Sequence, residues 1–235
     1  MSRLALLGGK QTIVEETSKP RNWRVSESFE EAFARYVGVK YALPVSSGQT
    51  ALNSALAGAG VGPGDEVIVV SFTWIASVSC VLHMNAIPIF ADIDPRTFTM
   101  DPEDVRRKIT PRTKAILPVD IYGHPADIVQ LKQIADENSL ILVEDAAQAT
   151  GARIGDKVVG GIAHITTFSF AGKPLASSSG GIMTTDDRGL YERAALAGQH
   201  PSLLSGLITD PELRSYVSTG GYGDNHRPDR HAMAS

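Results

Sequence analysis

The stretch LILVED at residues 140–145 decides the fold, because it is an apolar run that ends abruptly in two acids. A second run, ITTFSF at residues 165–170, is followed within three residues by Lys173. Short apolar runs of this kind are typical of strands buried on both faces of a parallel sheet. Ligands of such sheets gather beyond the carboxyl ends of the strands. Asp145 and Lys173 are therefore the first candidate functional residues.

Working outward from these runs, strand-like and helix-like segments alternate along most of the chain. The strands are predicted at residues 41–46, 66–72, 87–93, 113–119, 140–144, 165–170 and 181–185. The helices between them are predicted at residues 50–59, 75–84, 102–109, 128–138 and 188–197. This alternation predicts an α/β fold of three layers (α/β/α), in which helices cover both faces of a mostly parallel sheet.

The end of the chain differs in composition from the rest. Residues 1–200 are predicted to form one large domain that begins with an N-terminal arm. Residues 201–235 are rich in glycine, proline, serine and charge. They predict an irregular arm rather than a second domain.

Composition excludes several classes of protein. The chain has 235 residues, of which 43% are hydrophobic and 20% charged, so it can bury a substantial core. A net charge of -4 with scattered cations predicts no nucleic-acid partner. The apolar run near Met1 is too short for a signal peptide or a membrane span, and the lone Cys80 cannot form an internal disulfide. We therefore expect a cytoplasmic protein with no membrane partner.

Two further segments follow predicted strands. The stretch SSGQT at residues 46–50 opens a helix, where backbone N-H groups and hydroxyls suit a phosphate, although alone such a turn is more often only a cap. Trp74 has an indole suited to stacking on a flat heteroaromatic ring, or simply to packing in a core. Taken singly, Asp145 is explained as a helix cap and Lys173 as a solvated lysine.

The joint arrangement of these features favours pyridoxal phosphate (PLP) chemistry without a metal. A buried carboxylate keeps a pyridinium nitrogen protonated, and a lysine amine holds the cofactor aldehyde as a Schiff base. A phosphate-binding turn, a stacking ring, a carboxylate and a lysine occur in that order, each at the end of a predicted strand. Four independent ordinary explanations would have to coincide to reproduce this order.

The ordered motifs resemble the DegT/DnrJ/EryC1/StrS family of sugar aminotransferases. The resemblance implies PLP-dependent transferase fold type I, in which this chain matches the aspartate aminotransferase-like large domain. The motifs that carry it are GVKYA (38–42), PGDEVI (63–68), FTW (72–74), FADID (90–94), YGHPAD (122–127), EDAAQ (144–148) and FSF (168–170) before Lys173.

The resemblance implies roles around the cofactor ring. Asp145 would pair with the pyridine nitrogen, and Gln148 would bond the ring hydroxyl. Trp74 would cover one face of the ring. Lys173 would carry the Schiff base, and its freed amine would move the proton of the amino donor.

The resemblance also implies a phosphate site that two subunits share. Gly48, Gln49 and Ser169 would hold the phosphate within one subunit. Family members are dimers, so a homodimer is expected here, and Asn225 in the stretch GDNHR (223–227) would reach the phosphate of the neighbouring subunit.

The implied reaction moves an amino group from glutamate or glutamine to a keto sugar or keto cyclitol, in antibiotic or cell-surface sugar biosynthesis. Some positions depart from the family pattern: Ser169 and Lys173 are one residue closer than usual, Ser179 replaces an acid, Asp120 replaces a common histidine, and Ala163 with His164 replaces Gly-Asp. These departures indicate an outlying subgroup with altered specificity.

Three alternatives remain. The family continues into a smaller C-terminal domain, so a chain that stops at Ser235 is alternatively a truncated, non-catalytic member that acts as a binding or partner subunit. Coding sequence beyond Ser235 would favour the aminotransferase. In the family's sugar dehydratases a histidine replaces the lysine; Lys173 argues against this reading, although His164 is near in sequence. The third alternative, a Rossmann dehydrogenase, is not supported because the glycine fingerprint is missing after the first predicted strand.

Overall fold

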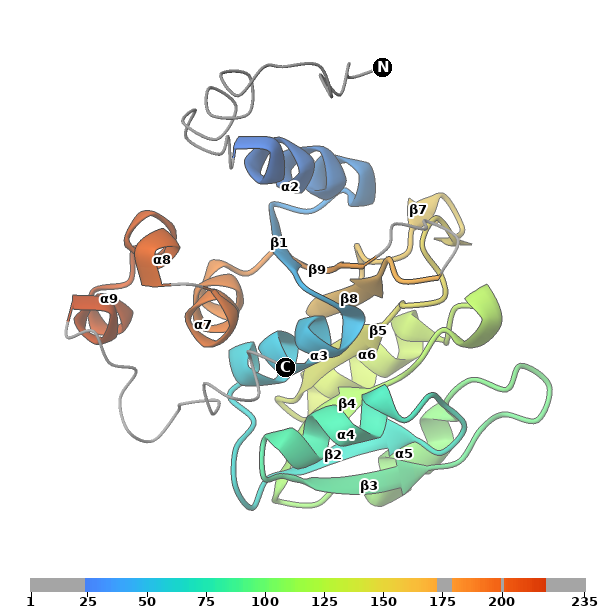
Figure 1. Ribbon diagram of the computed structural model, residues 1–235. Coiled ribbons are helices and arrows are strands. Elements are labelled where there is room, and N and C mark those ends of the chain that lie inside the picture. Colours follow the sequence, from blue (N-terminus) through green and yellow to red (C-terminus); the bar gives the residue numbers. More distant parts are fainter. Residues whose placement is uncertain (1–23, 173–178, 200, 219–235) are drawn as a thin grey trace, which may run out of the picture.

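The computed structural model describes residues 24–172, 179–199 and 201–218, and its centre is a seven-stranded sheet (Figure 1). The strand order is β1-β9-β8-β5-β4-β2-β3. The strands are β1 (Tyr41–Val45), β2 (Glu66–Val70), β3 (Ile87–Ala91), β4 (Thr113–Leu117), β5 (Ile141–Asp145), β8 (Ile165–Ser169) and β9 (Gly181–Thr185). Only β9 runs antiparallel to its neighbours in this sheet. The other six strands therefore end at one edge, the carboxyl edge, and begin at the opposite amino edge.

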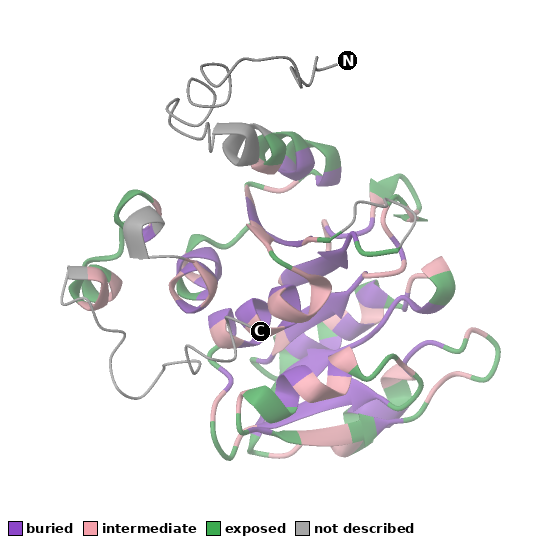
Figure 2. Cartoon of the chain, viewed as in Figure 1, coloured by how far each residue is buried: buried purple, intermediate pink, exposed green. Residues whose placement is uncertain are grey.

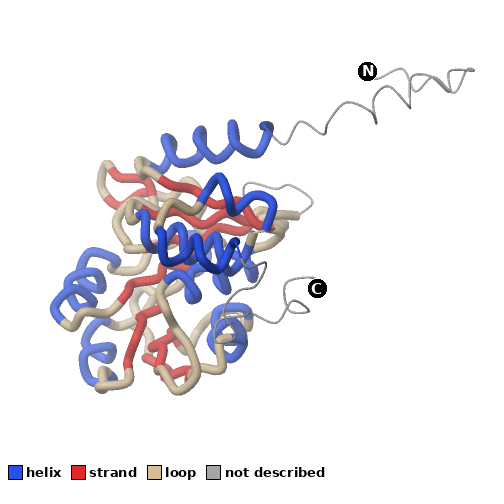
Figure 3. Tube along the Cα trace, turned by 90° about the vertical axis from the view of Figure 1, so that its left-hand side faces the viewer, coloured by secondary structure: helices blue, strands red, loops and turns tan. Residues whose placement is uncertain are grey.

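Helices cover both faces of the sheet, which confirms the predicted three-layer α/β fold (Figures 1 and 3). One face carries α3 (Gly48–Gly58), α4 (Ala76–His83) and α7 (Arg188–Gly198). The other carries α2 (Arg24–Val37), α5 (Pro102–Lys108) and α6 (Ile128–Glu137). None of the helices among residues 24–172, 179–199 and 201–218 is long and apolar enough to cross a membrane.

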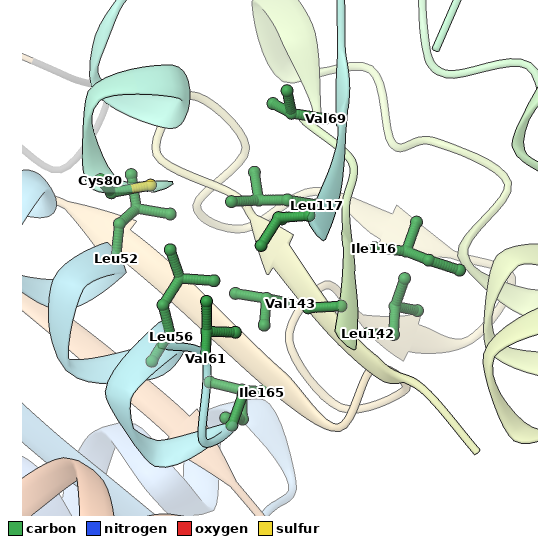
Figure 4. Close-up of a cluster of buried hydrophobic side chains, with 14 of the residues drawn as sticks. Leu52, Leu56, Val61, Val69, Cys80, Ile116, Leu117, Leu142, Val143 and Ile165 are labelled. Carbon is green, nitrogen blue, oxygen red and sulfur yellow. The ribbon is translucent and has the colours of Figure 1, made fainter. Parts of the chain in front are cut away.

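The main core lies on both faces of the sheet, under α3 and α4 on one side and under α5 and α6 on the other (Figures 2 and 4). Leu52 and Leu56 of α3 pack against the sheet beside Val143 and Leu117, and Cys80 closes the cluster from α4 (Figure 4). Full burial of one such leucine contributes about 1.5–3 kcal/mol. Burial also raises the pKa of the Cys80 thiol far above its usual range, so this cysteine is an inert core residue.

A smaller aromatic cluster secures the end of β8 from the opposite face. The ring of Phe33 on α2 lies 5.2 Å from the ring of Phe168 and 6.0 Å from that of Phe170, centroid to centroid. Both pairs are edge-to-face, the arrangement that aromatic quadrupoles favour. The strand end that carries Ser169 is therefore held by a helix more than 130 residues earlier in the chain.

The structure contains elements that the sequence patterns did not predict. The helix α2 and the hairpin of β6 (Arg153–Ile154) and β7 (Lys157–Val158) are two of them. The prediction of an irregular arm over residues 201–235 is wrong for the described part, which forms α8 (Pro201–Leu207) and α9 (Pro211–Ser218). The division into domains at residue 200 stays a prediction.

The buried Glu192 explains why this part of the chain is ordered. Its carboxylate accepts from the backbone N-H groups of Thr209 (3.0 Å) and Asp210 (2.9 Å) and from the Thr209 hydroxyl (2.6 Å). Arg188 donates to the same carboxylate at 2.6 Å. One side chain of α7 thus fixes the turn between α8 and α9.

Candidate active site

The N-terminus of α3, with Ser47, Gly48 and Gln49, lies at the carboxyl edge; these three residues are called the cup. Ser47 caps this helix: its hydroxyl accepts from the N-H of Thr50 at 3.2 Å, and its own N-H donates to the Thr50 hydroxyl at 2.9 Å. The N-H groups of Gly48 and Gln49, at the first two helical positions, have no partner within the helix. They point out of the helix end together with its positive dipole, which suits an anion such as a phosphate.

Ser169 of β8 lies directly against this cup. A Cβ added to Gly48 would come 2.7 Å from the Cβ of Ser169 and 3.0 Å from its hydroxyl oxygen. A Cβ on Gly181 would come 2.5 Å from the carbonyl oxygen of Ser47. Glycine is therefore required at both positions, and the structure brings Gly48, Gln49 and Ser169 together as predicted partners of one group.

Gln49 makes its contacts toward α4 rather than toward the cup. Its side-chain oxygen accepts from the Ser79 hydroxyl at 3.0 Å, and its Nε2 donates to Asn53 at 3.2 Å. The Gln49 side chain therefore joins two helices, and its backbone N-H is the group that faces the cup.

Asp145 ends β5 and is buried, with 4% of its surface exposed. The hydroxyl of Ser77 on α4 donates to Oδ2 at 2.7 Å, and the Ala147 N-H donates to Oδ1 at 3.1 Å. Thr73 and Ser77 share a further hydroxyl contact at 2.8 Å. These fixed donors hold the carboxylate in one orientation, as a partner of a pyridinium nitrogen requires.

Sequence reasoning missed Ser77. The residue is a polar side chain one helical turn after Trp74, in the apolar stretch IASVSCVL, and this spacing is the signal that would have found it.

Gln148 and Tyr122 link the ends of β4 and β5. The Gln148 side-chain oxygen accepts from the N-H of Tyr122 at 2.8 Å. Tyr122 has a φ of 53°, a left-handed conformation unusual for a residue with a side chain, and its ring is 80% exposed. The ring edge packs on Phe72, 6.3 Å away between centroids. Gln148, three residues after Asp145, thus supports the loop that carries Tyr122.

Trp74 precedes α4 in the same FTW motif and is 70% exposed. Exposure of this size excludes the alternative of a core tryptophan and leaves the indole face accessible at the carboxyl edge. Such a face suits stacking on a flat ring.

Lys173 and Asn225 lie outside the described residues. In sequence Lys173 follows Gly172, and the described residues on the two sides of the gap are joined by the hydrogen bond from the Phe170 N-H to the Gly180 carbonyl oxygen (2.9 Å). The Ser179 hydroxyl donates to the Ser46 carbonyl oxygen at 3.0 Å, so the described chain resumes in contact with the cup.

His164 lies at the other edge of the sheet. Its Nδ1 accepts from the N-H of Leu142 at 2.9 Å, at the beginning of β5, and its Nε2 lies 3.1 Å from Asp136. The histidine noted for the dehydratase alternative is therefore remote from Asp145 and is held in a structural network.

The described residues fit PLP. The cup that a glycine Cβ would fill, the buried carboxylate held by a hydroxyl, and the exposed indole occupy the ends of neighbouring elements at one edge. They match the phosphate, the pyridine nitrogen and the ring face of that cofactor in kind.

Comparisons with known proteins identify relatives along nearly the whole chain. GDP-perosamine synthase of Caulobacter vibrioides is 43% identical over 195 residues, which are 83% of this chain and 51% of that protein. L-glutamine:2-deoxy-scyllo-inosose aminotransferase of Streptomyces lividus is 42% identical over 230 residues, 93% of this chain and 54% of that protein. The chain spans about half the length of these curated relatives.

A solved structure agrees with these relatives. The crystal structure of DesV from S. venezuelae, in complex with a ketimine intermediate, is 46% identical with a TM-score of 0.70, over 72% of this chain and 46% of that one. The model of the DegT/DnrJ/EryC1/StrS aminotransferase family matches residues 12–205. The chain therefore belongs to the DegT/DnrJ/EryC1/StrS aminotransferase family.

Proposed function

We propose that the chain is the cofactor-binding part of a PLP-dependent aminotransferase that moves an amino group from glutamate or glutamine to a keto sugar or keto cyclitol. The observation that carries the proposal is the buried Asp145, held by Ser77 at the same edge as the α3 cup and Ser169. Enzymes of this family are PLP-dependent. The printed names of two relatives, a GDP-perosamine synthase and an L-glutamine-dependent cyclitol aminotransferase, support the substrate class and the donor.

When bound, PLP supplies an electron sink for the carbon that carries the amino nitrogen. Asp145 would hold a proton at the pyridine nitrogen, with Ser77 fixing the carboxylate. The N-H groups of Gly48 and Gln49 and the Ser169 hydroxyl would bind the phosphate.

Three further residues would act on one face of the ring, at the reacting carbon and at the ring hydroxyl. Trp74 would cover one face of the ring and exclude water there. Lys173 would be the attachment point of the cofactor and the base that moves the proton at the reacting carbon. Gln148 would donate to the ring hydroxyl.

The complete site is proposed to need a second subunit. In this arrangement two chains form a homodimer in the cytoplasm, and Asn225 reaches the phosphate of the partner site. Residues 201–235 would lead toward a smaller domain that closes over the substrate, as the half-length match to the relatives suggests.

The first test is cofactor attachment. The 235-residue chain is purified with PLP, its absorption spectrum is recorded, and the adduct is reduced with borohydride and mapped by mass spectrometry. Modification of Lys173, lost in Lys173→Ala and retained in a control at the exposed Lys157 (Lys157→Ala), supports the proposal. A folded chain that takes up no PLP overturns it.

The second test concerns the substrates. Glutamine and glutamate are supplied to the PLP-loaded protein, followed by keto sugars and keto cyclitols, and amine formation is measured. Transfer to one of these acceptors supports the substrate class. Loading without transfer, both in this chain and in a chain extended by any coding sequence beyond Ser235, supports the non-catalytic alternative.

A further inference from the structure

Two acids beside Asp145 meet on the other face of the sheet. A parallel bridge pairs Val119 with Asp145, so β4 continues alongside the end of β5. Side chains alternate between the faces of a sheet. Asp145 is contacted by Ser77 of α4, whereas Asp120 and Glu144 are each one position from the bridged pair and turn to the face of α6. Both are fully buried, with 0% exposed surface.

Each of the two carboxyl groups has one oxygen in an ordinary hydrogen bond. Asp120 Oδ1 accepts from the N-H of Ala126 at 2.9 Å, and Glu144 Oε2 accepts from the hydroxyl of Thr166 at 2.7 Å. The remaining atoms, Asp120 Oδ2 and Glu144 Oε1, are buried and accept from no donor in the described part of the chain. No cation of residues 24–172, 179–199 or 201–218 forms an ion pair with either group.

Two adjacent buried carboxylates without a cation would repel each other strongly. A proton on one of them removes the repulsion and satisfies both remaining oxygens at once, because the protonated oxygen donates and the other accepts.

The surroundings favour the proton on Asp120. Burial, then the charge of Glu144, raise the pKa of Asp120 well above its usual range. Burial also raises the pKa of Glu144, to about 7, although hydrogen bonds from Thr166, Asp120 and the Gly160 backbone oppose the rise. Asp145, across the sheet, is the other charged group that acts on both. The residue of β8 that lies beside Glu144 is the neutral Thr166. At the start of α6, the Asp127 carboxylate accepts a hydrogen bond from the Gln130 N-H.

We propose that Asp120 and Glu144 share one proton, with Asp120 Oδ2 donating to Glu144 Oε1, and that this acid pair positions Asp145. The pair joins β4 to β5 at the point where the backbone also joins them. The Asp120 N-H donates to the Asp145 carbonyl oxygen, and the Asp145 N-H donates to the Pro118 carbonyl oxygen, both at 3.0 Å. The acid pair thus adds a side-chain link between β4 and β5 to the two backbone hydrogen bonds that hold Asp145. The positioning part rests on the proposed function, whereas the shared proton does not.

The test uses amides that mimic each half of the pair. In Asp120→Asn the side-chain oxygen still accepts from Ala126, and the new NH₂ donates to Glu144 permanently. In Glu144→Gln the oxygen still accepts from Thr166, and the NH₂ donates to Asp120. In the double variant two NH₂ groups face each other, so the match is lost.

The first readout is urea unfolding of the full chain without PLP, over a range of pH. In the wild type the folded state holds a proton that the unfolded state releases above its ordinary carboxyl pKa, so stability falls as the pH rises toward the folded pKa. The unfolding constant changes by up to about tenfold per pH unit in this window. Both single variants lose this slope, and the double variant is less stable than the sum of the singles predicts.

A matched control and a direct readout complete the test. Asp127→Asn, seven residues from Asp120 at the exposed α6 cap, keeps the wild-type slope. Infrared spectra at about pH 6 show a protonated carboxyl band in the wild type that both single variants lack, since this acid is protonated above its ordinary pKa. An unchanged slope with no such band overturns the shared proton, as does failure of both single variants to fold.

The positioning role has its own measurement. In Asp120→Ala, which removes the donor to Glu144, PLP binds about tenfold or more weakly than in Asp120→Asn, and absorption titration of the cofactor measures the difference. Equal affinities overturn the positioning role. A wild type that binds no PLP but shows the slope and the band overturns the proposed function and leaves the shared proton standing.

Discussion

Two pairs of acids, one pair at each edge of the sheet, are held in opposite ways. At the amino edge, Glu66 is bound by the Thr110 hydroxyl and the Arg112 guanidinium, and Asp136 lies between Lys132 and His164. At the carboxyl edge, Asp120 and Glu144 are buried with only neutral donors among the described residues. The pKa values follow: the Thr110 hydrogen bond lowers that of Glu66, whereas burial raises that of Glu144 to about 7.

This difference distinguishes acids that stabilise the fold from acids that can act on a ligand. An acid that is paired with a neighbouring cation has a structural role, because its charge is already balanced within the protein. An acid held only by hydroxyls and N-H groups keeps its charge or proton for a ligand, or for another acid. The fold therefore accepts the cost of burying two acids together at Asp120 and Glu144, where no described cation offsets it.

The largest expected effect is that of Asp145→Asn at the carboxyl edge. The amide keeps an oxygen for the Ser77 hydroxyl but cannot sustain a proton on the pyridine nitrogen. We expect amino transfer from glutamine to PLP to slow by about 10²–10⁴-fold, the range for a lost proton-holding group, with the fold retained. Stopped-flow absorption of the loaded protein measures the rate.

The same exchange at the amino edge is the control. Asp187 caps α7 by accepting from the Leu190 N-H at 2.9 Å, and asparagine caps helices equally well. Asp187→Asn should leave the rate within a factor of two or so of the wild type. A rate in Asp145→Asn equal to that of the control would remove Asp145 from the chemistry.

A smaller effect is expected when a methyl group is added to the cup. In Gly48→Ala the new Cβ would press on Ser169 at 2.7 Å, so β8 and α3 have to separate. We expect a loss of about 1–3 kcal/mol in stability, the usual cost of overpacking, and PLP affinity about tenfold or more lower. Thermal unfolding and absorption titration measure the two.

Gly62 in the turn before β2, at the amino edge, is the matched control. A Cβ there meets nothing within 4 Å. Gly62→Ala should leave PLP affinity unchanged. If both alanine variants bind PLP as the wild type does, the cup is not where the phosphate lies.

The smallest expected effect concerns acid unfolding. The pKa of Glu66 is lowered in the fold, so its contribution to stability is present above its unfolded pKa and is lost as the pH falls through its folded pKa. Glu66→Gln should reduce the slope of stability against pH between about pH 5 and pH 3 by the equivalent of at most one proton, while the fall at higher pH due to the Asp120–Glu144 pair persists. Urea midpoints against pH test this, and an unchanged acid limb would contradict the contrast between the edges.

The parts of the fold with a strong local signal were predictable. All seven strands of the main sheet lie within two residues of the predicted ranges, because each is a short apolar run bounded by turns. The helix α2 was missed although Phe29, Phe33 and Val37 recur at helical spacing. This spacing is the amphipathic pattern of a surface helix, which is weaker as a signal than the continuous apolar runs of the strands.

For the site, the residues that follow strands were predictable and their companions were not. The placement of Asp145, Gly48 and Ser169 at one edge follows from the parallel topology alone. Ser77 and the pairing of Asp120 with Glu144 depend on strand order and register, in which β4 separates β2 from β5. No local pattern in the sequence encodes that order.

The antiparallel strand β9 also determines when the cup can form. It lies between β1 and β8 and pairs Tyr41 with Thr185, residues that are 144 positions apart. Contacts that close so long a stretch of chain form slowly, since their loop entropy is lost before they are gained. On the ribosome, Ser47 at the start of α3 is made early, yet its close neighbour Gly181 arrives only when β9 has emerged. The cup is thus among the last features of this sheet to be completed.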